Sequence, residues 1–354
     1  MSSSKTMKAV VFHGPKKVVV EDRPIPEIID QKDIIVKVSA TALCGSELHT
    51  FRGHQKSPTG FIMGHEFTGT VTATGSEVKT ISVGDKVVSP FTVSCSECFY
   101  CRNGFSSRCV DSTLFGSEKL DGGQAEYVRV PHADGTAVKA PSKIKDNALI
   151  LMADIFPTGY FGAKNAFKLI EPLKASEATV VVVGCGPVGL CAIVSALEYK
   201  PKHLFAVDSV ESRLELAKKL GAEPLNFAKD KEGMVKRVKE VTEGRGADAV
   251  IEVVGLSPAL RTAYDLLRPF GTISSIGVHN AEIPWSGAEA YAKNFRVQMG
   301  RCPVRSIFEE ALEVLAKNQD KFSFMFDKIM PLTDAVEGYD LFDNMKVQKV
   351  IFNP

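Results

Sequence analysis

Four cysteines stand close together in the pattern Cys95-x2-Cys98-x2-Cys101-x7-Cys109. This spacing can bring four thiolates to one point, which is the ligand set that tetrahedral zinc prefers in structural sites. A ferredoxin-type iron–sulfur cluster begins with the same spacing, but its fourth cysteine comes sooner and precedes proline, whereas Val110 follows Cys109 here. Disulfides are disfavoured because the sequence shows no apolar secretory signal. We therefore predict a closed zinc site that braces a loop.

A second set of metal-binding residue types is dispersed along the chain. Cys44 opens a segment that ends at His49, the pair His65 and Glu66 follows further on, and Asp154 stands far beyond them. Each residue also has a plain structural explanation: a small buried thiol, a hydrogen-bonded core histidine and a surface acid. The spacing does not by itself show that these side chains converge.

The segment Gly184–Gly189, with the sequence GCGPVG, has the G-x-G-x-x-G pattern of dinucleotide-binding loops. It follows the apolar run 179–183 and precedes a predicted helix, which is the context that the pattern requires. The first glycine allows a tight turn, the second lets the backbone approach a pyrophosphate, and the third lets helix and strand pack closely. A plain strand-to-helix turn is the alternative, and the context favours a cofactor site.

Asp208 ends the next predicted strand, nineteen positions after Gly189. A carboxylate at this point can accept hydrogen bonds from both hydroxyls of an adenine ribose, and it would repel a 2′-phosphate. The nearest basic residue in the sequence is Arg213, on the following predicted helix. These features favour NAD over NADP, and they are compatible with Asp208 also capping the helix that starts near Val210.

The elements that must position these residues fall into two kinds. The first third of the chain reads as short β-branched runs without intervening helices, which favours a barrel or sandwich-like unit. From about residue 155 strands and helices alternate, which predicts βαβ units and a parallel sheet. We predict strands at 8–13, 17–21, 33–39, 66–73, 86–89, 179–183, 204–207, 249–253, 272–276 and 349–352, and helices at 187–199, 210–220, 234–241, 258–267, 307–317 and 334–342.

Composition limits the class of protein. The chain has 354 residues, a formal net charge of +1, 44% hydrophobic residues and 24% charged residues. Its length suggests about two domains of ~150 residues each. The balanced charge gives no reason to expect a nucleic-acid partner, and the apolar runs are too short to span a membrane. We therefore expect a soluble, cytoplasmic protein.

Taken in order, these motifs resemble those of the zinc-dependent medium-chain alcohol dehydrogenase family. The matching motifs are Cys44-Gly-Ser-x-x-His49, Gly64-His65-Glu66, the four-cysteine lobe, Pro157-Thr158-Gly159-Tyr160, the glycine loop and Asp208. The resemblance implies an α/β fold with a β-rich GroES-like catalytic domain at residues 1–155 and 303–354. This domain would carry a structural zinc lobe at 91–113. Residues 156–302 would form a Rossmann domain with a doubly wound parallel sheet that binds NAD.

The resemblance also implies roles for individual residues. Cys44, His65 and Asp154 would hold a catalytic zinc, with Glu66 as a neighbouring or exchanging ligand. Many relatives carry Cys where Asp154 stands, and a subset resembling secondary-alcohol and formaldehyde dehydrogenases carries Asp. Glu47 stands where the family more commonly has an Asp that supports the histidine ligand, so the resemblance implies this supporting role for Glu47 less directly.

Further roles follow from the same resemblance. Ser46 and His49 would form a proton relay, and Phe91 and Leu114 would line the substrate pocket unless they are ordinary core residues. Cofactor contacts are implied for Gly184, Gly186, Pro187, Val188, Gly189, Asp208 and Arg213, for Thr158 at the nicotinamide, and for the Val278 backbone at its carboxamide.

The expected function is hydride transfer between NAD and a small-molecule alcohol or carbonyl compound, with two zinc ions per chain. The aspartate ligand favours a secondary alcohol or polyol. A related zinc-dependent aldehyde dehydrogenase or dismutase, and a non-catalytic NAD-binding relative, are the alternatives. The resemblance implies a homodimer or homotetramer with no nucleic-acid or membrane partner.

The metal content provides a first test. We expect two zinc ions per chain, and we expect Cys98→Ser to damage folding or stability, because closed zinc sites contribute folding free energy. Elemental analysis of the purified protein, together with thermal unfolding of the variant, checks both expectations. Iron in place of zinc, or a single zinc ion per chain, would contradict them.

Overall fold

The computed structural model describes residues 5–354, and the chain divides into two compact units. One unit comprises the chain up to Asp154 together with Pro303–Pro354, and the other comprises Ile155–Cys302. The predicted α/β fold, with a GroES-like β-rich part and a Rossmann-like parallel sheet, is confirmed. Among the described residues no helix is long and apolar enough to cross a membrane.

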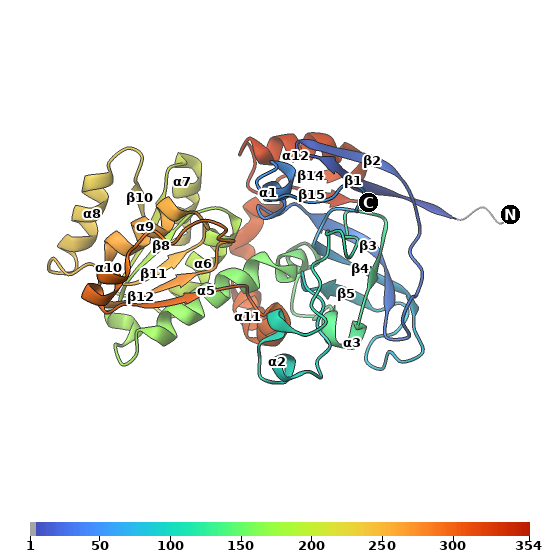
Figure 1. Cartoon of the computed structure of the whole chain (residues 1–354), viewed down its shortest axis with the longest axis horizontal. Coiled ribbons are helices and arrows are strands. Elements are labelled where there is room, and N and C mark those ends of the chain that lie inside the picture. The colour runs from blue at the N-terminus through green and yellow to red at the C-terminus, as the bar shows by residue number, and fades with distance from the viewer. Residues whose placement is uncertain (1–4) are drawn as a thin grey trace. The chain divides into compact units, whose positions relative to one another are not determined.

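The first unit is built on a seven-stranded sheet. Its strand order is β14-β15-β3-β4-β5-β7, and β6 pairs with β3. Figure 1 shows the C-terminal segment, in red, returning to the blue N-terminal strands of the same unit. The strands are β1 (Thr6–Gly14), β2 (Lys17–Pro24), β3 (Ile34–Ala42), β4 (Glu66–Thr74), β5 (Lys86–Ser89), β6 (Tyr127–Val130), β7 (Val138–Lys139), β14 (Ile329–Pro331) and β15 (Ile351–Asn353), with β1 and β2 forming a separate antiparallel pair.

The strands of this sheet enclose an apolar core. Ile34, Val36 and Phe67 have no exposed surface, and they pack with Phe115 in one cluster. The rings of Phe67 and Phe115 meet edge to face at 5.1 Å. Burying each ring contributes roughly 1.5–3 kcal/mol to folding, so β3 and β4 form a rigid base for the loops that leave them.

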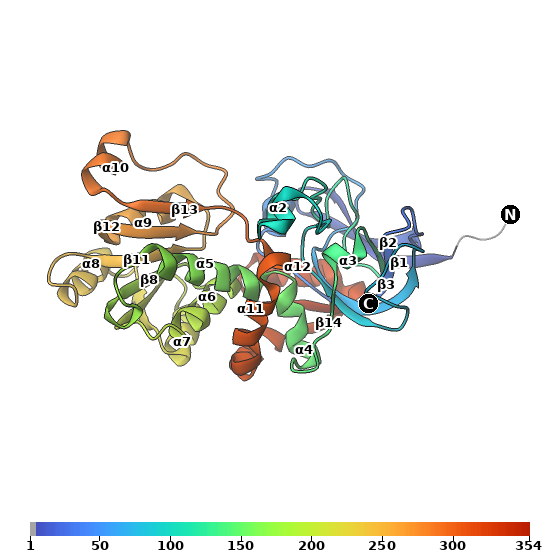
Figure 2. The same ribbon diagram turned by 90° about the horizontal axis from the view of Figure 1, so that it is seen from below.

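The second unit contains a six-stranded sheet in the order β10-β9-β8-β11-β12-β13, and every adjacent pair is parallel. This is a doubly wound order, whose direction reverses between β8 and β11. Figure 2 shows α6 and α7 to one side of these two strands and α9 to the other. The strands are β8 (Thr179–Val183), β9 (His203–Asp208), β10 (Glu223–Asn226), β11 (Ala247–Glu252), β12 (Leu267–Ser275) and β13 (Arg296–Met299).

The helices follow the predicted alternation. The second unit holds α5 (Ile155–Leu169), α6 (Pro187–Leu197), α7 (Glu211–Leu220), α8 (Lys231–Glu240), α9 (Ser257–Leu266) and α10 (Gly287–Lys293). The first unit holds α1 (Glu47–Phe51), α2 (Phe99–Arg102), α3 (Ala133–Thr136), α4 (Asp146–Leu149), α11 (Val304–Asn318) and α12 (Ala335–Asp343), with short 3₁₀ turns that include η1 (Ser106–Arg108) and η2 (Ile150–Ala153).

Helix α5 is the main element that the sequence pattern did not predict. Pro157 and two glycines within it suggest a turn, but Pro157 lies in the first turn, where a missing N–H costs nothing. A Cβ on Gly159 would lie 2.6 Å from the Ala192 backbone nitrogen, and one on Gly162 would lie 2.8 Å from the Ile276 side chain. The glycines therefore permit close packing of α5 on its neighbours.

Candidate active site and metal centres

Four side chains from three distant segments of the sequence meet inside the first unit. Ligand atoms of Cys44, His65, Glu66 and Asp154 all lie within 4.8 Å of one another, and all four residues are buried. Asp154 Oδ2 lies 3.5 Å from Cys44 Sγ and 3.3 Å from His65 Nε2. The convergence that the sequence left open is thus present in the fold.

The pairing of β3 with β4 explains this convergence. Ala42, at the end of β3, is paired with Glu66, at the start of β4, so that Cys44 and His65 leave the same end of the sheet. The turn before His65 needs glycine, because Gly64 has φ +100° and a Cβ on it would lie 2.5 Å from the Gln124 side chain.

The donor set fits a zinc ion. Sulfur, imidazole nitrogen and carboxylate oxygen are all zinc ligands, and three or four of them make a typical site. Glu66 Oε1 is buried and has no hydrogen-bond partner among the described residues. Lys349 Nζ balances the Glu66 charge at Oε2, but Oε1 stays a buried acceptor without a donor in residues 5–354, and a cation held by the neighbouring side chains would satisfy it.

The titration behaviour of the metal-free cluster reflects its burial. The pKa of the Cys44 thiol is raised by burial and by the nearby charges of Asp154 and Glu66. Burial works against protonation of His65, but the charge of Glu47 and hydrogen bonds to Asp154 and Cys44 raise its pKa well above the usual value. Burial raises the pKa of Glu66 to about 7, although Lys349 opposes the shift. Cys44 and His65 therefore carry protons that a cation must displace.

Glu47 supports the histidine of this cluster. Its Oε1 lies 3.6 Å from His65 Nδ1, and its Oε2 accepts a hydrogen bond of 2.9 Å from the Cys44 backbone N–H. Gln124 Nε2 lies 3.3 Å from the same carboxylate, and Gln124 Oε1 accepts a 2.9 Å bond from the Tyr339 hydroxyl. Glu47 thus lies beside the ring nitrogen of His65 that faces away from Asp154. Sequence reasoning missed Gln124 and Tyr339, which carry no motif.

Of the two residues of the expected relay, Ser46 contacts the cluster. Ser46 Oγ is 3.4 Å from His65 Nε2. His49 lies in α1 and is partly exposed. Burial and the neighbouring His54 and Arg52 lower the pKa of His49, so its imidazole is mostly neutral at pH 7 and can accept a proton.

The four-cysteine lobe forms a second cluster. Its sulfur atoms lie within 4.8 Å of one another, and all eight cysteines of the chain are free thiols. The Cys95 N–H points at Cys109 Sγ at 3.2 Å, and the Cys98 N–H points at Cys95 Sγ at 3.4 Å. Backbone N–H groups of Cys101 and Val110 lower the pKa of Cys98 to about 6. Such N–H···S contacts favour the thiolates that zinc requires.

In the second unit, the glycine loop has the geometry of a phosphate site. Gly184 has φ +97°, and a Cβ on Gly189 would lie 1.9 Å from the Gly184 carbonyl oxygen, so both positions require glycine. A Cβ on Gly186 would meet nothing within 4 Å, which leaves the backbone open to a ligand. Pro187 then begins α6, whose N-terminal N–H groups can bind an anion.

Asp208 ties the end of β9 to this loop. Its carboxylate accepts hydrogen bonds from the backbone N–H groups of Cys185 and Ser209, both at 2.7 Å, and of Val210 at 2.9 Å. Arg213 Nη1 lies 4.0 Å away. Asp208 thus holds the start of α7 as well as the glycine loop.

A buried glutamate that sequence reasoning missed shapes the neighbouring loop. Glu252 ends β11 and accepts bonds of 2.7 Å from the N–H groups of Val254 and Gly255 and from the Ser275 hydroxyl. A Cβ on Gly255 would lie 2.4 Å from the Val278 carbonyl oxygen, so the two loops touch. The available signal was an acid directly after the apolar run 249–251.

The remaining predicted residues differ in exposure. Val278 is 46% exposed on the loop after β12, and Thr158 is buried in α5. In the first unit Phe91 is buried, with its ring 6.1 Å from that of His65, and Leu114 is partly exposed. Phe91 therefore lies next to the cluster of Cys44, His65, Glu66 and Asp154.

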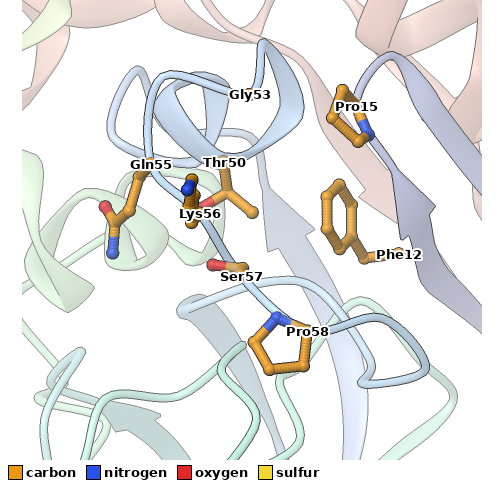
Figure 3. A pocket seen from close by; sticks show the side chains of 8 residues that line it. All are labelled: Phe12, Pro15, Thr50, Gly53, Gln55, Lys56, Ser57 and Pro58. Atoms are coloured by element: carbon orange, nitrogen blue, oxygen red, sulfur yellow. The ribbon is translucent and has the colours of Figure 1, made fainter.

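A hollow of about 400 Å³ opens elsewhere in the first unit, between Phe12 and Pro15 and the loop that follows α1 (Figure 3). Its other lining residues are Thr50, Gly53, Gln55, Lys56, Ser57 and Pro58. None of them is an acid, a cysteine or a histidine, so the hollow lacks the donors of a metal site.

Comparison with known proteins agrees with this geometry. Residues 30–142 match the family described as alcohol dehydrogenase GroES-like domain, and residues 187–317 match the family described as zinc-binding dehydrogenase. Zinc-type alcohol dehydrogenase B of Aspergillus flavus is 68% identical over 352 residues, which cover 99% of this chain and 82% of the relative.

Two further relatives extend the comparison. Medium chain reductase/dehydrogenase ucsI of Acremonium is 62% identical over 82% of this chain and 99% of its own length. The solved structure of alcohol dehydrogenase TADH from Thermus sp. ATN1 superposes with a TM-score of 0.90 at 33% identity, covering 98% of this chain and 99% of the other.

Binding of zinc to the cluster of Cys44, His65 and Asp154 should release protons. The raised pKa values leave the Cys44 thiol and the His65 ring protonated in the metal-free chain, whereas metal binding needs a thiolate and a free imidazole nitrogen. We expect the apparent zinc affinity to rise with pH, by roughly a hundredfold per unit near neutrality if both protons leave. Competition with a chelator of known affinity at several pH values measures this slope. An affinity independent of pH would argue against these two ligands.

Proposed function

The chain belongs to the zinc-dependent medium-chain alcohol dehydrogenases, and from that membership we propose that it uses NAD to interconvert a secondary alcohol or polyol with its carbonyl product. The observation that carries the proposal is the buried convergence of Cys44, His65 and Asp154. Catalysis is assigned to residues 1–155 and 303–354, and NAD binding to residues 156–302.

Two zinc ions per chain complete this proposal. Cys44, His65 and Asp154 would hold the catalytic ion, and the four cysteines of the 91–113 lobe would hold the structural one. When bound, the catalytic zinc supplies Lewis-acid activation of an alcohol or carbonyl oxygen. The thiolate and the carboxylate balance the charge of the ion, whereas direct ligation by Glu66 would add a negative charge and weaken that activation. Glu66 is therefore expected off the metal during turnover.

The proton of the alcohol needs a route out of the buried cluster. Ser46 Oγ, close to His65 Nε2, is positioned to take this proton, and the partly exposed His49 is suited to pass it to solvent. The lowered pKa of His49 supports this role, because a neutral imidazole can accept the proton at pH 7.

NAD would bind along the carboxyl ends of β8 and β9. The open backbone at Gly186 and the N-terminus of α6, with Pro187 and Val188, would receive the pyrophosphate. Asp208 would accept the ribose hydroxyls, with Arg213 nearby. Thr158 and the Val278 backbone would contact the nicotinamide ring and its carboxamide.

The substrate class rests on Asp154, which stands where many relatives have Cys. An NAD-linked screen of primary alcohols, secondary alcohols, polyols and aldehydes tests this preference. The family also leads us to propose a homodimer or homotetramer in the cytoplasm.

The ligand assignment predicts opposite results for two conservative variants. Asp154→Asn removes a charged ligand and should lose the catalytic zinc while the four-cysteine site keeps its ion. Glu66→Gln should leave the zinc content nearly intact and lower kcat. Metal analysis beside steady-state kinetics separates the two outcomes. Full zinc content and full activity in Asp154→Asn would show that another group is the third ligand.

Cofactor preference can be tested at Asp208. The wild-type protein should have the higher kcat/KM with NAD, because the carboxylate repels a 2′-phosphate. Asp208→Asn removes the charge but keeps an oxygen that can accept backbone N–H bonds. We expect it to shift the ratio of kcat/KM values toward NADP by roughly tenfold or more, which corresponds to ~1.4 kcal/mol. A wild-type ratio that favours NADP would contradict the assignment.

A further inference from the structure

Lys349 is a buried lysine behind the cluster of metal-binding side chains. The side chains of Lys349 and Glu66 have no exposed surface, and Lys349 Nζ lies 2.6 Å from Glu66 Oε2. The same ammonium donates a 3.0 Å hydrogen bond to the Leu43 carbonyl oxygen. Leu43 precedes Cys44, and Glu66 follows His65, so one positive charge contacts two of the three chain segments that carry the proposed ligands.

The backbone fixes Lys349 in this place. Ile351 in β15 is paired with Ala42 in β3, and the Leu43 N–H donates a 2.9 Å bond to the Val350 carbonyl oxygen. Burying an ammonium group is unfavourable without a charged partner, and Glu66 supplies that partner. The arrangement therefore depends on the C-terminal strand, although no motif marks Lys349 in the sequence.

We propose that Lys349 is a positioning residue that holds Glu66 beside the metal site and so sets how readily the site releases a divalent cation. This inference rests on the proposed assignment of Cys44, His65 and Asp154 as zinc ligands. The ion pair occupies Glu66 Oε2 and neutralises the carboxylate. The ligand set then keeps two negative charges, which match the two positive charges of zinc.

Without Lys349, the Glu66 carboxylate would lose its counter-charge within reach of the other donor atoms. A proton and the bound cation would then compete for it, and direct ligation would bring an additional anionic ligand to the cation. The metal would be held more tightly, and its open position would be lost. If the ion pair had only a structural role, its loss would loosen the site, and the metal would be released faster instead of more slowly.

The experiment compares zinc release in four proteins: wild type, Lys349→Met, Glu66→Gln and the double variant. Methionine keeps the length of the lysine stem without its charge, and the double variant removes both charges together. Release to a chromogenic chelator is followed from the fully loaded proteins. We expect Lys349→Met to slow release of the zinc ion held by Cys44, His65 and Asp154, the labile zinc, by roughly tenfold, the smallest effect usual for changes in groups that contact metal ligands. In a protein that already carries Glu66→Gln, adding Lys349→Met should alter the rate of zinc release by less than about threefold.

A spectroscopic readout accompanies the rates. With Co²⁺ in place of the labile zinc, Lys349→Met should change the visible absorption bands, which report the number and geometry of ligands, and the double variant should resemble Glu66→Gln. Faster release in both backgrounds, an equal effect in both, or an unchanged Co²⁺ spectrum would overturn the proposal. Failure of Lys349→Met to fold with zinc present, while the double variant folds, would also overturn it. Full zinc content in Asp154→Asn would instead refute the ligand assignment itself.

Discussion

The antiparallel pairing at the end of β3 is the constraint on which the metal-binding cluster depends. Ala42 is paired with Glu66 on one side and with Ile351 on the other. This register brings three segments to one place: the loop that starts at Cys44, the turn that carries His65, and the C-terminal strand preceded by Lys349. A slip of one residue in either pairing would point alternate side chains to the opposite face of the sheet.

Charge balance is the second constraint, because the cluster is buried. Three acids, Glu47, Glu66 and Asp154, lie around one thiol and one imidazole in a place that water barely reaches. Hydrogen bonds from the Cys44 N–H and from Gln124, and the ion pair with Lys349, stabilise part of this negative charge. A bound cation would balance the rest and displace the protons that Cys44 and His65 hold in its absence, so the proposed metal site would also contribute to the stability of this part of the fold.

Sequence motifs and periodic patterns predicted most of the fold, whereas residues outside these motifs gave little information. The glycine loop and the alternation of apolar runs with helices have fixed periods, and they indicated the parallel sheet and its cofactor loop. Helix α5 escaped prediction because Pro157, Gly159 and Gly162 resemble turn residues locally, and only tertiary packing shows why they are there. Lys349 and Gln124 were not predicted, because a buried polar side chain is recognised by its partners, and partners distant in the sequence cannot be paired from one chain.

Asp208 has a consequence for how this protein could change its coenzyme during evolution. The carboxylate proposed to distinguish two nucleotides also accepts the Cys185 N–H inside the phosphate loop. A substitution that simply deleted it would leave that buried N–H without an acceptor and loosen the loop for either nucleotide. The accessible route therefore has an order: a neighbouring group must first accept the Cys185 N–H, and only then can the Asp208 carboxylate be lost without loss of nucleotide binding.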